Sequence, residues 1–336
     1  MSKRTIFPEG YAPRLDGRDT QRGIKIIKDN FEKYLAVALN LHRVSAPMFV
    51  TADSGLNDNL NGVERPVSFD IPELGGEVEV VHSLAKWKRY ALAQYGFGPG
   101  EGLYTDMNAI RRDEELDNLH SVYVDQWDWE KVITKDQRTT AYLMATVRSI
   151  YGAMKQTAAT ACYEFPAIDF PLADEIFFVT AQELEDAYPR KTPKERENAI
   201  CHDKKSVFII GIGDRLAGGA PHDGRAPDYD DWALNGDILV WNKLLGIGFE
   251  LSSMGIRVSE ESLRAQLEKA GCPERAKLPF HRALLRGELP YTVGGGIGQS
   301  RLCMLMLRKA HIGEVQASVW PAHMRKSCAE HGIPLL

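Results

Sequence analysis

Apolar residues recur at spacings of three and four over residues 19–41 of this chain. Such a spacing places them on one face of an α-helix and predicts an amphipathic helix with a single buried stripe. The stripe consists of Ile27, Phe31, Tyr34, Leu35 and Ala38. Pro47 ends the extended segment that follows. Because a helix of this kind most often packs on its own domain, the pattern alone does not identify a second binding surface.

A second group of patterns predicts a sheet. Alternating positions or short apolar runs indicate strands near residues 78–82, 120–128, 207–211, 237–241 and 249–257. Between them, Thr192, Pro193 and Glu195 form the start signal of a helix that should run toward His202. The strands do not alternate regularly with helices, which favours an antiparallel or mixed sheet over a doubly wound one. The expected fold class is therefore α+β, with a mainly antiparallel sheet flanked by helices.

The chain has 336 residues, enough for one large domain or two small ones, and no linker-like stretch divides it. We expect an N-terminal extension over residues 1–18 and a single domain over residues 19–336. No apolar run reaches the length of a membrane span, and the first ten residues lack the apolar core of a secretory signal. The sequence therefore predicts neither membrane insertion nor secretion.

Cysteine count and charge narrow the class of protein further. The five cysteines are odd in number and have no close pair, which disfavours a disulfide framework and a structural zinc site. A reducing, cytoplasmic compartment is the expected setting. The formal net charge of -5 gives no overall attraction to a polyanion, so nucleic-acid binding is not expected.

The glycine-rich run at residues 294–298 is the first candidate for ligand chemistry. Gly294, Gly296 and Gly298 let the backbone approach a flat or phosphorylated ligand. Arg301 follows where a helix over residues 302–307 should begin, and a guanidinium can stack on adenine while its charge assists the phosphates. These features suit an ATP site without a Walker loop. Taken alone, a glycine-rich lead into a C-terminal helix would explain the same residues.

Two arginines, Arg111 and Arg112, precede an alternating strand over residues 120–130. On that strand Gln126 and Asp128 point to the same face, because strand side chains alternate. A bidentate arginine can grip a carboxylate and a phosphate oxygen in a fixed geometry. An amide can orient a reacting carboxylate, and a second carboxylate can receive an ammonium group. The alternative is a solvated charge run in a hairpin loop beside an amphipathic strand.

Asp237 and Glu250 lie thirteen residues apart on two strands that a hairpin would join, so their carboxylates could converge. Two carboxylates beside a triphosphate suggest Mg²⁺, which prefers oxygen ligands. Arg257 follows seven residues after Glu250 and can reach the same pocket, and Lys88 is the other candidate cation. Without further evidence, solvent-facing carboxylates and a surface lysine would be the ordinary explanation.

The order of these segments resembles the catalytic domain of class II aminoacyl-tRNA synthetases. Five blocks, at residues 82–89, 120–130, 228–232, 234–241 and 294–301, more closely resemble ammonia-dependent asparagine synthetases. The resemblance runs from about Thr20 to the C-terminal end. It implies a class II synthetase-like catalytic core and a homodimer. It also implies that ATP and L-aspartate form β-aspartyl-adenylate and pyrophosphate, and that ammonia then gives L-asparagine and AMP.

The resemblance further implies roles for individual residues. The catalytic residues it implies are Asp58, Arg111 and Gln126. Those for binding L-aspartate are Ser83, Lys88, Gln126, Asp128, Asp230, Ser252, Ser253 and Arg257. Those for binding ATP are Arg111, Asp237, Glu250, Gly294, Gly295, Gly296 and Arg301, with Mg²⁺ held by Asp237 and Glu250. Asp58 would bind ammonium and accept its proton, although its Asn- and Gly-rich surroundings are by themselves typical of a turn.

Several points stay open. The family's spacing selects Arg111 for the α-phosphate, whereas the Arg-x-Glu pattern of class II synthetases selects Arg112. Ser300 stands where many of those synthetases carry an acidic residue. The link at residues 231–234 is shorter than in bacterial family members, so a shielding loop is expected to be reduced there. The alternative functions are an aspartyl- or asparaginyl-tRNA synthetase, for which an anticodon-binding domain has no room, and a catalytically silent synthetase-like subunit, against which the retained charged residues argue.

Overall fold

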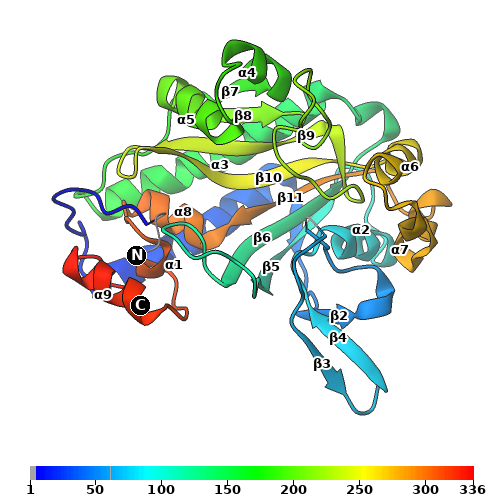
Figure 1. Cartoon of the computed structure of the whole chain (residues 1–336), viewed down its shortest axis with the longest axis horizontal. Helices are drawn as coiled ribbons and strands as arrows, with labels where there is room; N and C mark the ends of the chain where they lie inside the picture. The colour runs from blue at the N-terminus through cyan, green and yellow to red at the C-terminus, as the bar shows by residue number, and fades with distance from the viewer. Residues whose placement is uncertain (1–4, 61) are drawn as a thin grey trace.

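The computed structural model describes residues 5–60 and 62–336, and its main element is an eight-stranded sheet (Figure 1). From edge to edge the strands are β1 (Leu41–Arg43), β5 (Gly102–Ile110), β6 (Tyr123–Val132), β11 (Thr292–Gly298), β10 (Ile247–Arg257), β9 (Asp230–Asn242), β8 (Ser206–Ile210) and β7 (Phe177–Thr180). The edge strands β1 and β7 run parallel to their neighbours, and the other neighbouring pairs are antiparallel. The expected mainly antiparallel sheet is confirmed.

Three helices cover one face of this sheet: α1 (Gly17–Leu39), α3 (Thr140–Glu164) and α8 (Gln299–Met306). α1 is capped by Asp16 and ends where Asn40 adopts a left-handed backbone conformation. The apolar stripe predicted on this helix is buried at Ile27, Phe31 and Leu35. Ala38 was expected on the same stripe but is exposed, and Leu39 is buried there instead.

The opposite face carries α2 (Ala85–Gln94) and α5 (Pro193–Lys204), with α4 (Ala181–Ala187) beside α5. α5 begins with the predicted capping box at Thr192, whose side chain accepts a hydrogen bond from the third helical amide. Buried residues alternate along β8 between a core on the α3 side and a core on the α5 side. Both faces of the sheet are therefore covered, except where the cavity described below opens.

The remaining elements lie around this body. A small sheet of β2 (Phe49–Thr51), β4 (Gly76–Val80) and β3 (Ser68–Ile71) projects from it in Figure 1. The other α-helices are α6 (Glu260–Lys269), α7 (Pro279–Leu285) and α9 (Ala322–Glu330), and short 3-10 helices span Ala52–Ser54, Lys135–Gln137, Pro273–Lys277 and Ile312–Glu314. Within residues 5–60 and 62–336, no helix has the length and apolar character needed to cross a membrane.

Residues 1–4 of the expected N-terminal extension lie outside the described residues. The part that follows contacts the body of the protein. The Ile6 amide donates to Oδ1 of Asn118 at 2.6 Å, and the Tyr11 hydroxyl donates to Glu314 at 2.8 Å. Both partners are distant in sequence, so this segment packs on the domain.

Two local expectations need correction. The glycine run belongs to strand β11, and the helix expected from Leu302 already begins at Gln299. The short link expected at residues 231–234 lies inside β9, as an irregular stretch between the pairs Asp230–Arg257 and Asn235–Gly255. Trp232 is fixed there by a hydrogen bond from its amide to Gln266. The long connection of this region lies earlier, at residues 211–229 between β8 and β9.

Candidate active site

A cavity of about 480 Å³ opens on the sheet face that carries α2 and α5. Strands β6, β10 and β11 contribute its floor, and the loops at residues 111–122 and 211–229 contribute to its walls. Most residues singled out from the sequence line it: Asp58, Ser83, Lys88, Arg111, Gln126, Asp128, Asp230, Glu250, Ser252, Ser253, Arg257, Gly295, Gly296 and Arg301. Gly294 and Asp237 are not part of the lining.

The register of the three floor strands gives the cavity two ends. Gly294 pairs with Glu130 and Gly298 pairs with Gln126. On the next strand, Ile256 pairs with Val293 and Ser252 with Ile297. Arg257 therefore lies toward the Glu130 end of the floor, and Glu250 lies toward the Gln126 end. Gln126 and Asp128 share the cavity face, as the alternation predicts.

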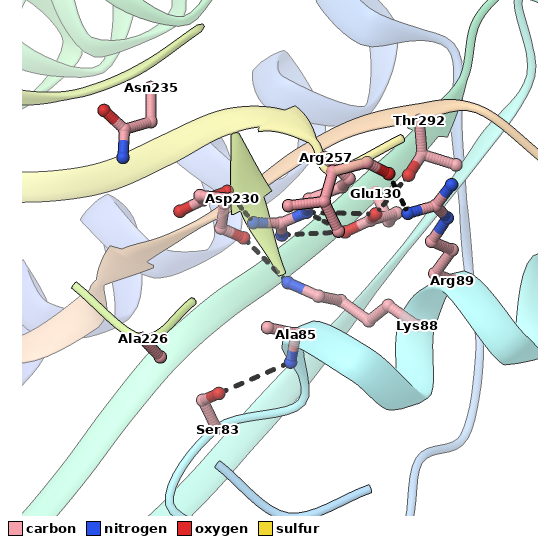
Figure 2. Close-up of polar contacts among 12 residues, drawn as sticks. Ser83, Ala85, Lys88, Arg89, Glu130, Ala226, Asp230, Asn235, Arg257 and Thr292 are labelled. Carbon is pink, nitrogen blue, oxygen red and sulfur yellow. Dashed lines mark hydrogen bonds and ion pairs between the residues drawn. The ribbon is translucent and has the colours of Figure 1, made fainter. Parts of the chain in front are cut away.

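A buried ion-pair network occupies the Glu130 end (Figure 2). The Arg257 guanidinium donates to both oxygens of Glu130, at 2.8 to 3.1 Å, and also contacts Asp230. Thr292 donates a further hydrogen bond to Glu130 at 2.7 Å. Burial would lower the pKa of Arg257, but the two carboxylates outweigh burial and raise it. Arg257 is therefore a permanent cation held in one orientation.

Lys88 is the second cation at this end. Its ammonium lies 3.2 Å from Oδ2 of Asp128 and donates to the carbonyl oxygen of Gly295 at 3.0 Å. The Lys88 side chain is 1% exposed, so it is not a surface lysine. Burial lowers the pKa of this ammonium, and the Asp128 carboxylate opposes part of that shift. Lys88 and Arg257 thus lie among three carboxylates, those of Asp128, Glu130 and Asp230, and the buried Arg89 is a third cation near Glu130.

Three arginines gather toward the Gln126 end. Arg301 lies 3.6 Å from the Glu250 carboxylate and donates to its backbone carbonyl oxygen at 3.2 Å. Arg111 lies 3.9 Å from Glu114, and its Nε is buried with no hydrogen-bond partner in the described part of the chain. Arg225, from the loop at residues 211–229, contacts the Asp237 carboxylate. Donors without partners at a cavity wall suit an anionic ligand with several oxygen atoms.

The carboxylates of Asp237 and Glu250 suit a magnesium ion. Oδ1 of Asp237 is buried and accepts no hydrogen bond from any described residue. Burial raises the pKa of Asp237 to about 7, with Arg225 opposing the shift and Glu250 adding to it. Among the described residues no three His, Cys, Asp or Glu side chains form a metal cluster. Two carboxylates are nevertheless sufficient for Mg²⁺ bound with a nucleotide, because Mg²⁺ keeps phosphate and water oxygens in its shell.

Asp58 lies on the cavity wall below α2. Its side chain is 3% exposed, accepts from the Ser83 hydroxyl at 2.8 Å and accepts from the Leu60 amide at 2.9 Å. Ser83 is therefore directed at Asp58. Ser252 is also held by a hydrogen bond, because its hydroxyl donates to the Gly296 carbonyl oxygen at 3.0 Å. These hydrogen bonds fix both serines at the lining.

Comparison with known proteins identifies the family to which this chain belongs. The family model of aspartate–ammonia ligases matches residues 18–332. The chain belongs to the aspartate–ammonia ligase family. A relative named aspartate–ammonia ligase from Ruminiclostridium cellulolyticum is 62% identical over 332 residues, which cover 98% of this chain and 99% of the relative. A ligase of the same name from Clostridium tetani is 60% identical, covering 100% of this chain and 98% of the relative.

Solved structures with the same fold are aminoacyl-tRNA synthetases. Asparaginyl-tRNA synthetase from Pyrococcus horikoshii, complexed with asparaginyl-adenylate, aligns with a TM-score of 0.66 and 14% identity over 90% of this chain and 70% of that one. The Entamoeba histolytica asparaginyl-tRNA synthetase aligns with a TM-score of 0.61 and 12% identity, and this chain spans 66% of its length. The predicted class II synthetase-like core and the predicted family are both confirmed.

For this member of the ligase family, some lining residues had no clear signal in the sequence. Arg225 lies on the loop at residues 211–229, whose path depends on tertiary contacts. A Gly–Arg pair just before the block at residues 228–232 is the only local hint. Glu130 belongs to a recognised block, but its role as the partner of Arg257 requires the register of the sheet.

Proposed function

We propose that this chain makes L-asparagine from L-aspartate, ammonia and ATP, through β-aspartyl-adenylate, with AMP and pyrophosphate as the other products. The observation that carries the proposal is the division of one cavity into two ends. Buried cations and carboxylates lie at the Glu130 end, arginines lie at the Gln126 end, and Gln126 and Asp128 lie on the floor between them. Membership of the aspartate–ammonia ligase family supports the choice of substrates.

The Glu130 end has the charges that L-aspartate requires. Lys88 and Arg257 can hold the carboxylate that does not react, because both are buried and fixed in orientation. Asp128 and Asp230 can receive the α-ammonium group, because both carboxylates line the cavity at this end. Gln126 can then orient the reacting carboxylate toward the other end without adding a competing charge.

The Gln126 end serves the nucleotide. Arg111 can donate to the α-phosphate and to the attacking carboxylate at once, which stabilises negative charge in the transition state. Arg301 can stack on adenine while Glu250 holds its guanidinium. Held by Asp237 and Glu250, Mg²⁺ would supply neutralising charge for the phosphates. Gly296 keeps the floor free of a side chain beside Gln126 and Asp128.

Asp58 is proposed to act on ammonia in the second step. Ammonium must lose a proton before its nitrogen can attack the adenylate. A carboxylate fixed by Ser83 and by the Leu60 amide can bind ammonium and then accept that proton. The nitrogen would form the new amide bond as AMP leaves.

A product assay tests the proposal. The protein is incubated with ATP, Mg²⁺, L-aspartate and either ammonium or glutamine, and the nucleotides and amino acids are identified. Ammonium-dependent asparagine together with AMP supports the proposal, whereas ADP as the product overturns the adenylate mechanism. Transfer RNA charging in a parallel assay would favour the alternative function of an aminoacyl-tRNA synthetase.

We also propose that the protein works as a cytoplasmic homodimer. α1 and the extended segment after it resemble the interface element of class II synthetases, and the five cysteines are free thiols. Light scattering should give a mass of about two 37.6 kDa chains. A fully active species with the mass of one chain would overturn the homodimer.

A further inference from the structure

Arg225 covers the carboxylate of Asp237 on the side of the cavity. Arg225, Ser253 and Glu250 line the cavity, whereas Asp237 does not and is only 6% exposed. The guanidinium contacts Oδ2 of Asp237, and Oδ1 has no hydrogen-bond partner within residues 5–60 and 62–336. The Arg225 guanidinium would therefore repel a cation that approaches Asp237 from the cavity.

The loop that carries Arg225 is fixed by contacts on both sides of it. His222 lies 3.3 Å from Glu197 of α5, and His281 of α7 lies 3.0 Å from Asp228. The Trp232 indole donates to the carbonyl oxygen of Ala226 at 3.3 Å. The backbone next to Arg225 is thus held in place, and its side chain is the part that can move.

The Arg225 side chain has other partners, including the Glu250 carboxylate. Burial would lower the pKa of Arg225, but the Asp237 and Glu250 carboxylates outweigh burial and raise it. Besides Asp237 the guanidinium donates to the neighbouring carbonyl oxygen of Gly224 at 2.9 Å and lies 3.6 Å from the exposed Asp223. Its Nε is buried with no partner among the described residues. A phosphate oxygen is an acceptor that would satisfy such a donor. The guanidinium could therefore leave Asp237 for a phosphate group without breaking a larger hydrogen-bond network.

We propose that Arg225 and a divalent cation compete for Asp237, and that the metal–nucleotide complex displaces the guanidinium onto its own phosphates. The competition rests on the proposed function, because it requires a metal–nucleotide complex in this cavity. A guanidinium and a metal ion repel each other at a shared carboxylate. Once displaced, Arg225 would join Arg111 and Arg301 as a third cation available to the polyphosphate.

This exchange links metal binding to nucleotide binding. A metal ion alone must remove Arg225 from Asp237 with no new acceptor for the guanidinium, so its affinity should be low. A nucleotide supplies that acceptor and should raise the affinity for the metal. By thermodynamic linkage, the metal should raise the affinity for the nucleotide by the same factor.

Mn²⁺ is the probe for the competition, because it takes the same oxygen ligands and its paramagnetic signal reports binding without any turnover. Binding is measured for the whole protein without nucleotide, at the same pH for every variant. Arg225→Met keeps the length of the side chain and removes its charge. We expect this variant to bind Mn²⁺ about tenfold more tightly than the unaltered protein. Unchanged or weaker binding overturns the competition.

Two further variants test whether the change in Mn²⁺ binding is specific to Arg225 and Asp237. Arg215→Met removes the same charge from an exposed position on the same loop and should bind Mn²⁺ as the unaltered protein does. Adding Asp237→Asn to Arg225→Met should abolish the gain, and persistence of the gain would overturn the assignment to Asp237. Circular dichroism checks the fold of each variant. The proposed function is tested separately, because ammonium-dependent AMP formation by the unaltered protein does not depend on how Arg225→Met binds Mn²⁺.

Discussion

A Cβ atom on Gly294 would collide with Oε2 of Glu130. It would also lie 2.7 Å from the guanidinium of Arg257, closer than real Cβ contacts allow. The glycine is thus required by the buried ion pair at the Glu130 end of the cavity. Its neighbour Gly296 has a similar role, since a Cβ there would lie 2.8 Å from Asp128 and collide with Gln126. These glycines make room for side chains that position the substrate.

We predict that Gly294→Ala lowers the free energy of unfolding by about 3 kcal/mol, because the pair of Arg257 and Glu130 must shift or separate. The KM for L-aspartate should rise in the same variant. Urea unfolding and initial rates measure the two effects. Gly152→Ala is the matched control, since Gly152 has open space around it in α3 and alanine there should stabilise the helix by roughly 0.5–1 kcal/mol. Equal stability of the two variants would contradict the packing argument.

We predict that Arg111→Ala reduces turnover about a hundredfold, because one charge-assisted donor to a developing phosphate charge contributes about 3 kcal/mol. Its stability in urea should change little. Arg112 also lines the cavity, so Arg112→Ala is the control and should have the milder effect. An essential Arg112 with a dispensable Arg111 would reverse the assignment.

A third prediction concerns pH. Burial lowers the pKa of His311 to about 4, because its ring lies against Trp320 and its Nε2 has no hydrogen-bond partner among the described residues. In the unfolded chain the His311 ring binds a proton near pH 6.5, whereas in the folded protein the buried ring stays neutral down to about pH 4. Stability should therefore fall as the pH drops from about 6.5 toward 4, by about 2 kcal/mol between pH 6.5 and pH 5.

Urea unfolding at several pH values tests that slope. His311→Asn keeps an acceptor for the Gly313 amide and removes the titrating group, so this part of the pH dependence should disappear. His323→Asn, at an exposed position, should leave the slope unchanged. A slope that survives in His311→Asn would assign it to other groups.

The parts of the fold that could be predicted are those with a repeated local pattern. The spacing of Ile27, Phe31 and Leu35 identified α1, and the alternation around Gln126 and Asp128 gave the correct face of β6. The capping signal at Thr192 gave the start of α5. Each of these predictions depends on interactions within one turn or one strand, between residues that are close together in the sequence.

The parts that could not be predicted depend on contacts distant in sequence. Residues 231–234 resemble a link, yet they continue β9 between two residues that pair with β10, and Gln266 accepts the hydrogen bond of the Trp232 amide. Arg225 reaches the cavity because of where the loop at residues 211–229 is anchored. Ser300 donates to Asp125 at 2.8 Å, a contact between residues 175 positions apart that no local pattern indicates.

The final prediction separates the two half-reactions. Asp58 is proposed to act on ammonia, whereas Arg111, Gln126 and the carboxylates of Asp237 and Glu250 are proposed to act on adenylation. Asp58→Asn keeps the size of the side chain and removes its charge. It should still exchange labelled pyrophosphate into ATP when L-aspartate is present, while asparagine formation falls. Glu250→Gln should lose both activities, because adenylate no longer forms.

Hydroxylamine sharpens this test because, unlike ammonium, it is mostly unprotonated near neutral pH and needs no base before it attacks. If Asp58 accepts the proton of ammonium, Asp58→Asn should retain more of its hydroxamate formation than of its asparagine formation. Asp70→Asn, at an exposed position on β3, is the matched control and should retain both. Loss of pyrophosphate exchange in Asp58→Asn, with an intact circular dichroism spectrum, would instead place Asp58 in the binding of L-aspartate or ATP. Equal loss of asparagine and hydroxamate formation with exchange intact would make Asp58 a residue that positions the nucleophile. Loss of a base alone should spare hydroxylamine, because hydroxylamine needs no base before it attacks.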